Sequence, residues 1–390
     1  MSTLYPHHLT TLTSNYRKAF DELENLIPGL ECLLIHSGSE QFYYADDRGI
    51  NFQAFGHFRH WLPVNRPDQL VLIRPGVKPV YFQVIPADFW YEQSIDNQSW
   101  WADSWEIVAL RQASDIKTHL HGIRGLGFIG ENAGFANSLG IEPRLINPEP
   151  LLHYLDFLRA YKSPYEVEQL AAANALGLRG HQAAQCAFAE GGSEYAIHMA
   201  FLAACEVLEE ECPYTNIVAL DEKSAILHYQ YKRRNSGDAK NRKSQTLLLD
   251  AGCRINGYCS DITRTSIRTH TLPLFISLLA AMEKLQQQLV NKVRPQLAYQ
   301  DLQQQALAGV GRILMDHEIL TGSHDEIIEQ KLPSLFLPHG VGHLLGIQVH
   351  DVGGKQRNAS GEQLEAPADA PALRNTRIMD PGMVFTVEPG

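Results

Sequence analysis

A short acidic hairpin in the second half of the chain constrains the fold more than any other segment. Residues 247–264 read Leu-Leu-Leu-Asp-Ala-Gly-Cys-Arg-Ile-Asn-Gly-Tyr-Cys-Ser-Asp-Ile-Thr-Arg. Asn256-Gly257 lies between two apolar runs, and this dipeptide is the strongest short-range signal for a two-residue β-turn. The pattern therefore predicts an antiparallel hairpin in which Ile255 lies opposite Tyr258.

This register brings two acidic side chains together. It places Gly252 opposite Asp261, and Asp250 points to the same face as Gly252 because strand side chains alternate. The two aspartates are then diagonal neighbours about 7–8 Å apart at the backbone, and Gly252 leaves room for a cation between them. The alternative is a pair of solvent-exposed acids at a sheet edge, but the three leucines at 247–249 favour burial, which is costly without a counter-charge.

Three histidines follow within a glycine-rich segment. They are His339, His343 and His350, between Leu337 and Asp351. Imidazole suits transition metals, and glycines permit close backbone approach, so the segment indicates a mixed nitrogen and oxygen metal site. Glu388 closes an apolar run from Met383 that predicts a strand, and it is a candidate third acidic ligand; a plain strand-end acid is the alternative.

The first part of the chain predicts a separate α/β domain. Short apolar runs alternate with turns and read as strands at 32–35, 70–73, 80–85, 107–110 and 125–130. A boundary is marked where Ser163, Pro164 and Glu166 form a capping box at the start of a long helix. We therefore expect an N-terminal domain at 1–158 and a second domain at 159–390.

The second domain has a mixed pattern of helices and strands. We expect helices from 164 to about 190 and from 193 to about 211, and further helices around 272–292 and 299–317. Strands are expected at 216–220, 246–250 and 383–388.

Composition excludes several classes of function. The formal charge of −11 argues against a nucleic-acid partner, and it gives no attraction to anionic lipid. No basic and apolar leader is visible at the N-terminus, and no run is long enough to span a membrane. The six scattered cysteines predict reduced, mostly buried thiols, so we expect a cytoplasmic protein.

Taken together, these residues resemble those of the pita-bread metallopeptidases, a family that includes methionine aminopeptidase, aminopeptidase P and prolidase. The likeness extends to 35–38, 213–220 and 225–229, which look like segments of bacterial Xaa-Pro dipeptidases, some also known as organophosphorus acid anhydrolases. The resemblance implies an α+β chain with a C-terminal pita-bread (creatinase/aminopeptidase) fold and an N-terminal α/β creatinase-like domain. It implies metal-dependent hydrolysis of dipeptides that end in proline.

The resemblance also implies a role for each site residue. Two divalent cations, expected to be Mn²⁺, are bound by four residues of the family's ordered ligand set: Asp250, Asp261, His343 and Glu388. The catalytic histidine matches His350, and the substrate-side histidine of the Pro-His-Gly motif matches His339. Expected substrate contacts are Tyr214, His228, Tyr299 and Asp47, with Asp47 reaching the site of the partner subunit in a homodimer.

One departure from the family pattern lies at the end of the sequence. The family's fifth ligand, a glutamate some tens of residues after Glu-Pro-Gly, has no counterpart before Gly390. For this chain we therefore expect weakened binding of at least one metal and poor turnover. The alternatives are an aminopeptidase P-like enzyme acting on longer peptides, a side activity on organophosphorus triesters, and a catalytically inactive pita-bread module that binds peptides.

Overall fold

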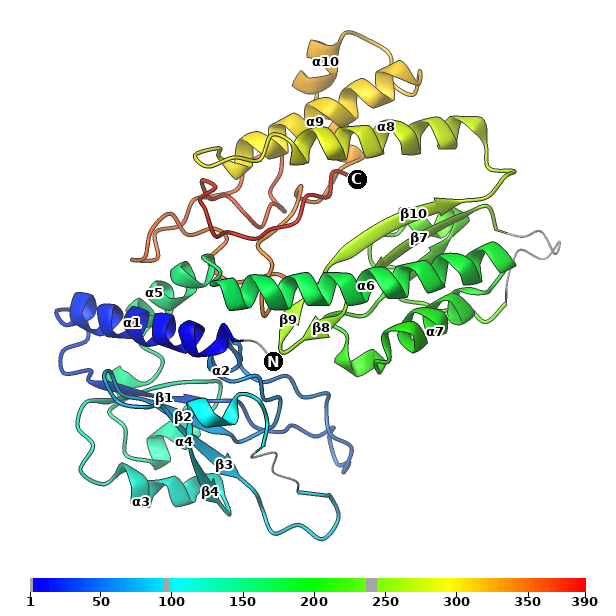
Figure 1. Ribbon diagram of the computed structural model, residues 1–390. Coiled ribbons are helices and arrows are strands. Elements are labelled where there is room, and N and C mark those ends of the chain that lie inside the picture. Colours follow the sequence, from blue (N-terminus) through cyan, green and yellow to red (C-terminus); the bar gives the residue numbers. More distant parts are fainter. Residues whose placement is uncertain (1–2, 94–97, 236–243) are drawn as a thin grey trace. The chain divides into compact units, whose positions relative to one another are not determined.

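The computed structural model describes residues 3–93, 98–235 and 244–390 (Figure 1). The chain divides into two compact units. The first comprises Met1–Arg159 with Ser163–Glu166 and Ala359–Gly361, and the second comprises Ala160–Lys162, Val167–Asn358 and Glu362–Gly390. The units separate next to Arg159, and the sequence-based boundary lies between 158 and 159.

The first unit is built on a five-stranded sheet with the order β4-β3-β2-β1-β5. Strands β1 and β5 are parallel, as are β3 and β4, whereas β2 runs antiparallel to both β1 and β3. Because β1, β2 and β3 are buried at every position, their sequences are largely apolar, with His36 and Gln83 as the polar exceptions, and do not alternate. All five predicted strands are present: β1 Cys32–His36, β2 Leu70–Ile73, β3 Val80–Val84, β4 Glu106–Leu110 and β5 Leu126–Ile129.

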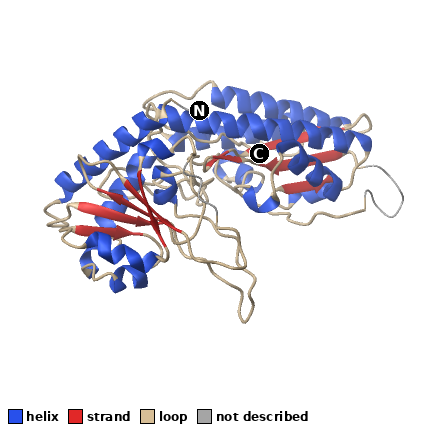
Figure 2. Cartoon of the chain, turned by 60° about the horizontal axis from the view of Figure 1, so that its bottom comes forward, coloured by secondary structure: helices blue, strands red, loops and turns tan. Residues whose placement is uncertain are grey.

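Helices pack beside this sheet (Figure 2). The longest is α1, Tyr5–Leu23, in which Leu9, Leu12, Tyr16 and Phe20 form a buried stripe at helical spacing. Helix α1 packs against α5. The other elements are α2 Gly56–Trp61, α3 Lys117–Leu120, α4 Ala133–Ser138, α5 Glu149–Arg159 and the 3₁₀ turns η1 Ala102–Ser104, η2 Ala113–Ile116 and η3 Pro143–Leu145.

Two helices open the second unit. Helix α6, Pro164–Glu190, starts at the predicted capping box, since Ser163 N–H donates to Glu166 Oε2 at 2.8 Å. Helix α7, Glu194–Cys205, starts after Ser193 as expected, but the predicted end near 211 is wrong. Glu206 adopts a left-handed conformation at the C-cap. A longer helix would have placed the acidic run 209–211 at its negative end, so the chain forms a 3₁₀ turn, η4 Glu209–Glu211, instead.

The sheet of the second unit confirms the predicted hairpin. Its order is β10-β7-β6, with β6 Ile217–Leu220, β7 Thr246–Ala251 and β10 Ile262–Ile267. The two-stranded extension consists of β8 Arg254–Ile255 and β9 Tyr258–Cys259, with Ile255 paired to Tyr258 as expected. Asn256 and Gly257 both have positive φ, of 48° and 98°, which the tight turn requires.

A second core forms around two long helices later in the chain. Helices α8 and α9 pack on each other, and their apolar residues share a core with Leu337, Val341 and Leu373. The predictions for 272–292 and 299–317 are thereby confirmed. These and the remaining elements are α8 Pro273–Val290, α9 Tyr299–Asp316, α10 His324–Glu329, η5 Asp221–Ala225 and η6 Leu332–Leu335.

The predicted strand at 383–388 is not a regular strand. Only isolated bridges form, between Tyr161 and Met383 and between Leu344 and Phe385. The segment runs beside the histidine segment, and Thr386 N–H donates to the His343 carbonyl at 3.0 Å. The return bond from His343 N–H goes to the Thr386 hydroxyl instead of a backbone carbonyl, which interrupts the ladder.

Two further observations concern the environment of the chain. Among the described residues, no helix combines the length and apolar character needed to cross a bilayer. All six cysteines are free thiols, and all but Cys186 are buried, as the sequence predicts.

Candidate metal centre and active site

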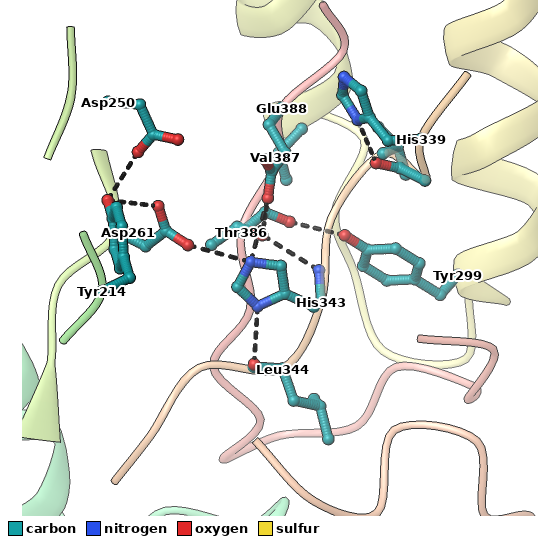
Figure 3. A network of polar contacts seen from close by, with 12 residues as sticks. Tyr214, Asp250, Asp261, Tyr299, His339, His343, Leu344, Thr386, Val387 and Glu388 are labelled. Carbon is teal, nitrogen blue, oxygen red and sulfur yellow. Dashed lines mark hydrogen bonds and ion pairs between the residues drawn. The ribbon is translucent and has the colours of Figure 1, made fainter. Parts of the chain in front are cut away.

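The hairpin of the second unit carries Asp250 on β7 and Asp261 directly before β10 (Figure 3). In β7, Leu247, Leu249 and Ala251 are buried, and Asp250 points to the other face. The β7–β10 pairing of Asp250 with Thr263 continues the register of the turn, so Gly252 lies opposite Asp261 as predicted. The reason for glycine differs from the expected one: a Cβ at Gly252 would collide with the Ser260 carbonyl oxygen, so the missing side chain serves backbone approach.

The hydroxyl of Tyr214 lies between the two aspartates. It is 2.7 Å from Asp250 Oδ1 and 2.9 Å from Asp261 Oδ1 (Figure 3). A hydroxyl has a single proton to donate, so it cannot neutralise two carboxylates at once. Burial and then the charge of Asp261 raise the pKa of Asp250 to about 7. The carboxylates of Asp250 and Asp261 therefore face each other across a space in which a cation would be stabilised.

His343 lies between Asp261 and Glu388 and adds an imidazole nitrogen to the possible metal ligands. Its Nε2 lies 3.1 Å from Asp261 Oδ2 and 3.3 Å from Glu388 Oε1. Its Nδ1 donates to the Leu344 carbonyl at 2.9 Å, which leaves Nε2 facing the carboxylates. Burial opposes protonation of this imidazole, but the hydrogen bonds to Asp261 and Glu388 outweigh burial and raise the pKa of His343 to about 10.

Thr386 links two of these residues, and sequence reasoning missed it. Its hydroxyl donates to Glu388 Oε1 at 2.6 Å and accepts from His343 N–H at 3.0 Å. Burial alone would raise the pKa of Glu388, yet the bonds from His343 and Thr386 hold it below its usual value. The sequence contained a signal for this role, because Thr386 and Glu388 are two residues apart in an extended segment and their side chains therefore share a face.

Replacing Thr386 with valine is expected to weaken metal binding by about 10- to 100-fold, because residues that orient metal ligands contribute that much to affinity. Isothermal titration with Mn²⁺ measures the change. Thr376→Val is a matched control, since Thr376 is fully buried and donates to the Leu364 carbonyl at 2.7 Å away from the ligands. Equal losses in both variants would mean that Thr386 acts only through packing.

A glycine and a tyrosine support the histidine segment from behind. Gly342 has φ of +149°, and a Cβ there would meet both the Thr386 carbonyl oxygen and the Tyr299 hydroxyl. That hydroxyl donates to the Thr386 carbonyl at 2.6 Å. Tyr299, expected to contact substrate, has a relative exposure of 0%, so it supports the ligand-bearing backbone and offers no surface to a substrate in this structure.

The other two histidines of the segment lie near the ligands. The rings of His350 and His343 are 4.4 Å apart at an angle of 88°. Partial loss of solvent, and then the charge on His343, lower the pKa of His350 to about 4. His339 Nδ1 donates to the Gly340 carbonyl at 3.0 Å (Figure 3), and His339 contributes electrostatically to the lowered pKa of Glu388. Both side chains are partly accessible, as residues that contact a substrate must be.

Two further predicted substrate contacts, His228 and Asp47, are not tested by the structure. His228 is exposed on the turn that follows η5. Asp47 is exposed on the loop between β1 and α2 and belongs to the first unit. Their roles stay predictions.

The donor set fits divalent metal ions. Ligand atoms of Asp261, His343 and Glu388 all lie within 4.8 Å of one another, and Asp250 reaches the other oxygen of Asp261 through the Tyr214 hydroxyl. Carboxylates with one neutral imidazole nitrogen suit Mn²⁺, Zn²⁺ and related ions. The high pKa of His343 has the same origin, since a proton there does what a cation would do between two carboxylates.

Two family models match the chain, one in each part of it. The model of the N-terminal domain of Xaa-Pro dipeptidases matches residues 3–157, and that of metallopeptidase family M24 matches residues 168–390. The fold and the donor set thus define a two-domain metallopeptidase.

The chain belongs to metallopeptidase family M24. It is 39% identical over 393 residues to the Xaa-Pro dipeptidase of Edwardsiella ictaluri (strain 93-146) and 38% identical over 392 residues to that of Pseudoalteromonas translucida (strain TAC 125). Both alignments cover 100% of this chain and 86% of the relative.

Solved structures share the fold. Escherichia coli aminopeptidase P with the inhibitor Pro-Leu superposes with a TM-score of 0.73 at 20% identity, covering 96% of this chain and 86% of that one. The zinc-substituted form of the same enzyme in complex with product also gives a TM-score of 0.73, at 21% identity. The predicted pita-bread fold with an N-terminal domain is thereby confirmed.

Proposed function

We propose that this chain is a Xaa-Pro dipeptidase, which hydrolyses the peptide bond before a C-terminal proline. The observation that carries the proposal is identity of 36–39% to Xaa-Pro dipeptidases along the whole chain. The convergence of Asp261, His343 and Glu388 supports it, because these are the donors that a hydrolytic metal centre needs.

Two divalent cations are proposed to bind around Asp261. Asp261, His343 and Glu388 would hold one ion, and Asp250 with Asp261 would hold the other. When bound, such ions supply a water activated near neutral pH and positive charge for the developing oxyanion. The residues of the chain set the orientation: Leu344 fixes the His343 tautomer.

The remaining polar groups act on the substrate. His350 is held neutral at pH 7 and can donate a hydrogen bond to the oxygen that becomes negative in the transition state. His339 lies on the Glu388 side and can contact the substrate end there. Tyr214 offers an aromatic ring to proline, and His228 completes the pocket. Asp47 of one protomer is proposed to reach the site of its partner.

A direct assay distinguishes this function from its alternatives. We expect the metal-loaded chain to cleave Leu-Pro faster than a longer Xaa-Pro peptide or a phosphotriester. Faster cleavage of the longer peptide would identify an aminopeptidase P-like enzyme, whose fold the solved structures share. A chain that purifies without metal, measured by mass spectrometry, and cleaves none of the three would be a binding module.

The identity of the metal, the assembly and the compartment are part of the proposal. Mn²⁺ is the proposed ion, a homodimer the proposed assembly and the cytoplasm the proposed location. Free, mostly buried thiols support a reducing compartment. Sedimentation of the full chain at several concentrations tests the dimer, and activity after reconstitution with Mn²⁺, Zn²⁺ or Co²⁺ tests the metal.

A further inference from the structure

A second group of metal-ligating side chains lies in the first unit. His8 is on α1, His60 is on α2, and Glu166 is in the first turn of α6, which belongs to this unit. Their relative exposures are 1%, 7% and 4%. Burying a carboxylate among imidazoles is costly unless its charge is paired, and the proposed peptidase chemistry does not use these residues.

The spacing of the three side chains suits an ion. His60 Nε2 is 3.2 Å from Glu166 Oε1, and His8 Nδ1 is 3.9 Å from Glu166 Oε2. The three ligand atoms lie within 4.8 Å of one another. Zinc–nitrogen and zinc–oxygen bonds of about 2.0–2.2 Å put neighbouring ligands of a tetrahedral site about 3.4 Å apart, so small rotations close the remaining gaps.

Hydrogen bonds orient His8 as a ligand. Its Nε2 is 2.8 Å from the His60 carbonyl oxygen and therefore carries the proton, so Nδ1 is the unprotonated nitrogen, which accepts from Ser163 Oγ and lies 3.9 Å from Glu166 Oε2. Ser163 Oγ, 2.9 Å from Nδ1, is close enough to supply a fourth donor. A metal-binding histidine commonly donates its other nitrogen to a backbone carbonyl in this way.

His60 and Glu166 are oriented as well. His60 Nε2 is buried and makes no hydrogen bond, although it faces Glu166. Ser163 N–H donates to Glu166 Oε2 at 2.8 Å, which turns Oε1 toward His60. Burial lowers the pKa of His60 to about 4 and also lowers that of His8, so both imidazoles are neutral at pH 7, the form that binds metals.

One nearby charge opposes a cation. Arg159 is buried and contributes to the low pKa of His60, but its influence there is weaker than that of Glu166. At His60, therefore, the charge of the Glu166 carboxylate outweighs that of the Arg159 guanidinium. The negative charge of Glu166 is therefore required for the proposed ion to bind.

We propose that His8 Nδ1, His60 Nε2 and Glu166, with Ser163 Oγ, bind a divalent transition-metal ion as a structural site of the first unit. Two imidazoles and a carboxylate match Zn²⁺ best. The site is independent of the proposed peptidase centre, because its donors belong to the other unit.

The test uses the full chain with the peptidase centre silenced by Asp261→Asn and His343→Ala. After chelation and dialysis against Zn²⁺, we expect one bound equivalent by mass spectrometry and a higher melting temperature than without zinc. Adding Glu166→Gln should weaken zinc binding at least tenfold and remove the zinc-dependent shift. Glutamine keeps the capping box, so the metal-free melting temperature should change little.

Two further variants separate ligation from folding. His57→Gln is the matched control, since His57 is a buried histidine of the same helix paired with Asp156 at 2.9 Å, and it should retain the zinc. His8→Gln should lose it while circular dichroism shows an intact fold. No zinc in the silenced parent, or equal zinc in the parent and in Glu166→Gln, would overturn the proposal.

Discussion

Replacing Asp261 with asparagine is expected to reduce kcat/KM for Leu-Pro by at least about 10³-fold relative to the unsubstituted chain. Asp261 lies between the two groups of possible metal ligands, His343 with Glu388 on one side and Asp250 on the other. Its Oδ2 is 3.1 Å from His343 Nε2, and its Oδ1 is 2.9 Å from the Tyr214 hydroxyl. Asparagine has the same shape but no charge, and its NH₂ group cannot bind a cation where Asp261 offers a second oxygen. Metal centres stabilise the transition state by several kcal/mol, and each 1.36 kcal/mol is a factor of ten in rate.

The same variant should lose metal affinity, which separates a failed centre from a misplaced substrate. Isothermal titration with Mn²⁺ should show weaker binding, while circular dichroism stays unchanged. Asp316→Asn is the control, because Asp316 is an exposed aspartate at the end of α9. If Asp261→Asn kept even a tenth of the parent activity, Asp261 would not be the shared ligand.

Replacing Asp351 with asparagine is expected to lower the free energy of unfolding by about 3–5 kcal/mol, the usual cost of breaking a buried ion pair. Lys162 Nζ lies 3.0 Å from Asp351 Oδ2, and the two side chains are only 1% and 2% exposed. Removal of the carboxylate leaves a buried ammonium without its negative partner. Urea denaturation followed by tryptophan fluorescence measures the loss.

The double variant Lys162→Met with Asp351→Leu should recover most of that stability, because two apolar residues need no charge partner. Glu362→Gln is the control, since the Arg357–Glu362 pair has a similar distance of 3.1 Å but is 67% and 51% exposed, and exposed pairs contribute about 1 kcal/mol or less. A loss below 1 kcal/mol in Asp351→Asn would show that the pair contributes little. Asp351 directly follows His350, so the single variant should also reduce turnover.

Much of the fold could be predicted because its signals are local. The Asn256-Gly257 turn is set by which residues accept positive φ, and the capping box at Ser163 is set by hydrogen bonds three residues apart. Apolar runs identified β1, β2 and β3 because those strands are buried at every position. The end of α7 and the irregular segment at 383–388 were missed, since each depends on neighbours that propensity does not describe.

The site divides in the same way. By itself the sequence determined the register that places Asp261 opposite Gly252, and it singled out the residue types that bind metals. Only the tertiary structure decided that Tyr214 Oη lies between the aspartates, that Thr386 links His343 to Glu388, and that Tyr299 is buried behind them. Register follows from strand periodicity over a few residues, whereas these contacts join segments dozens of residues apart, and packing of the whole unit sets their distances.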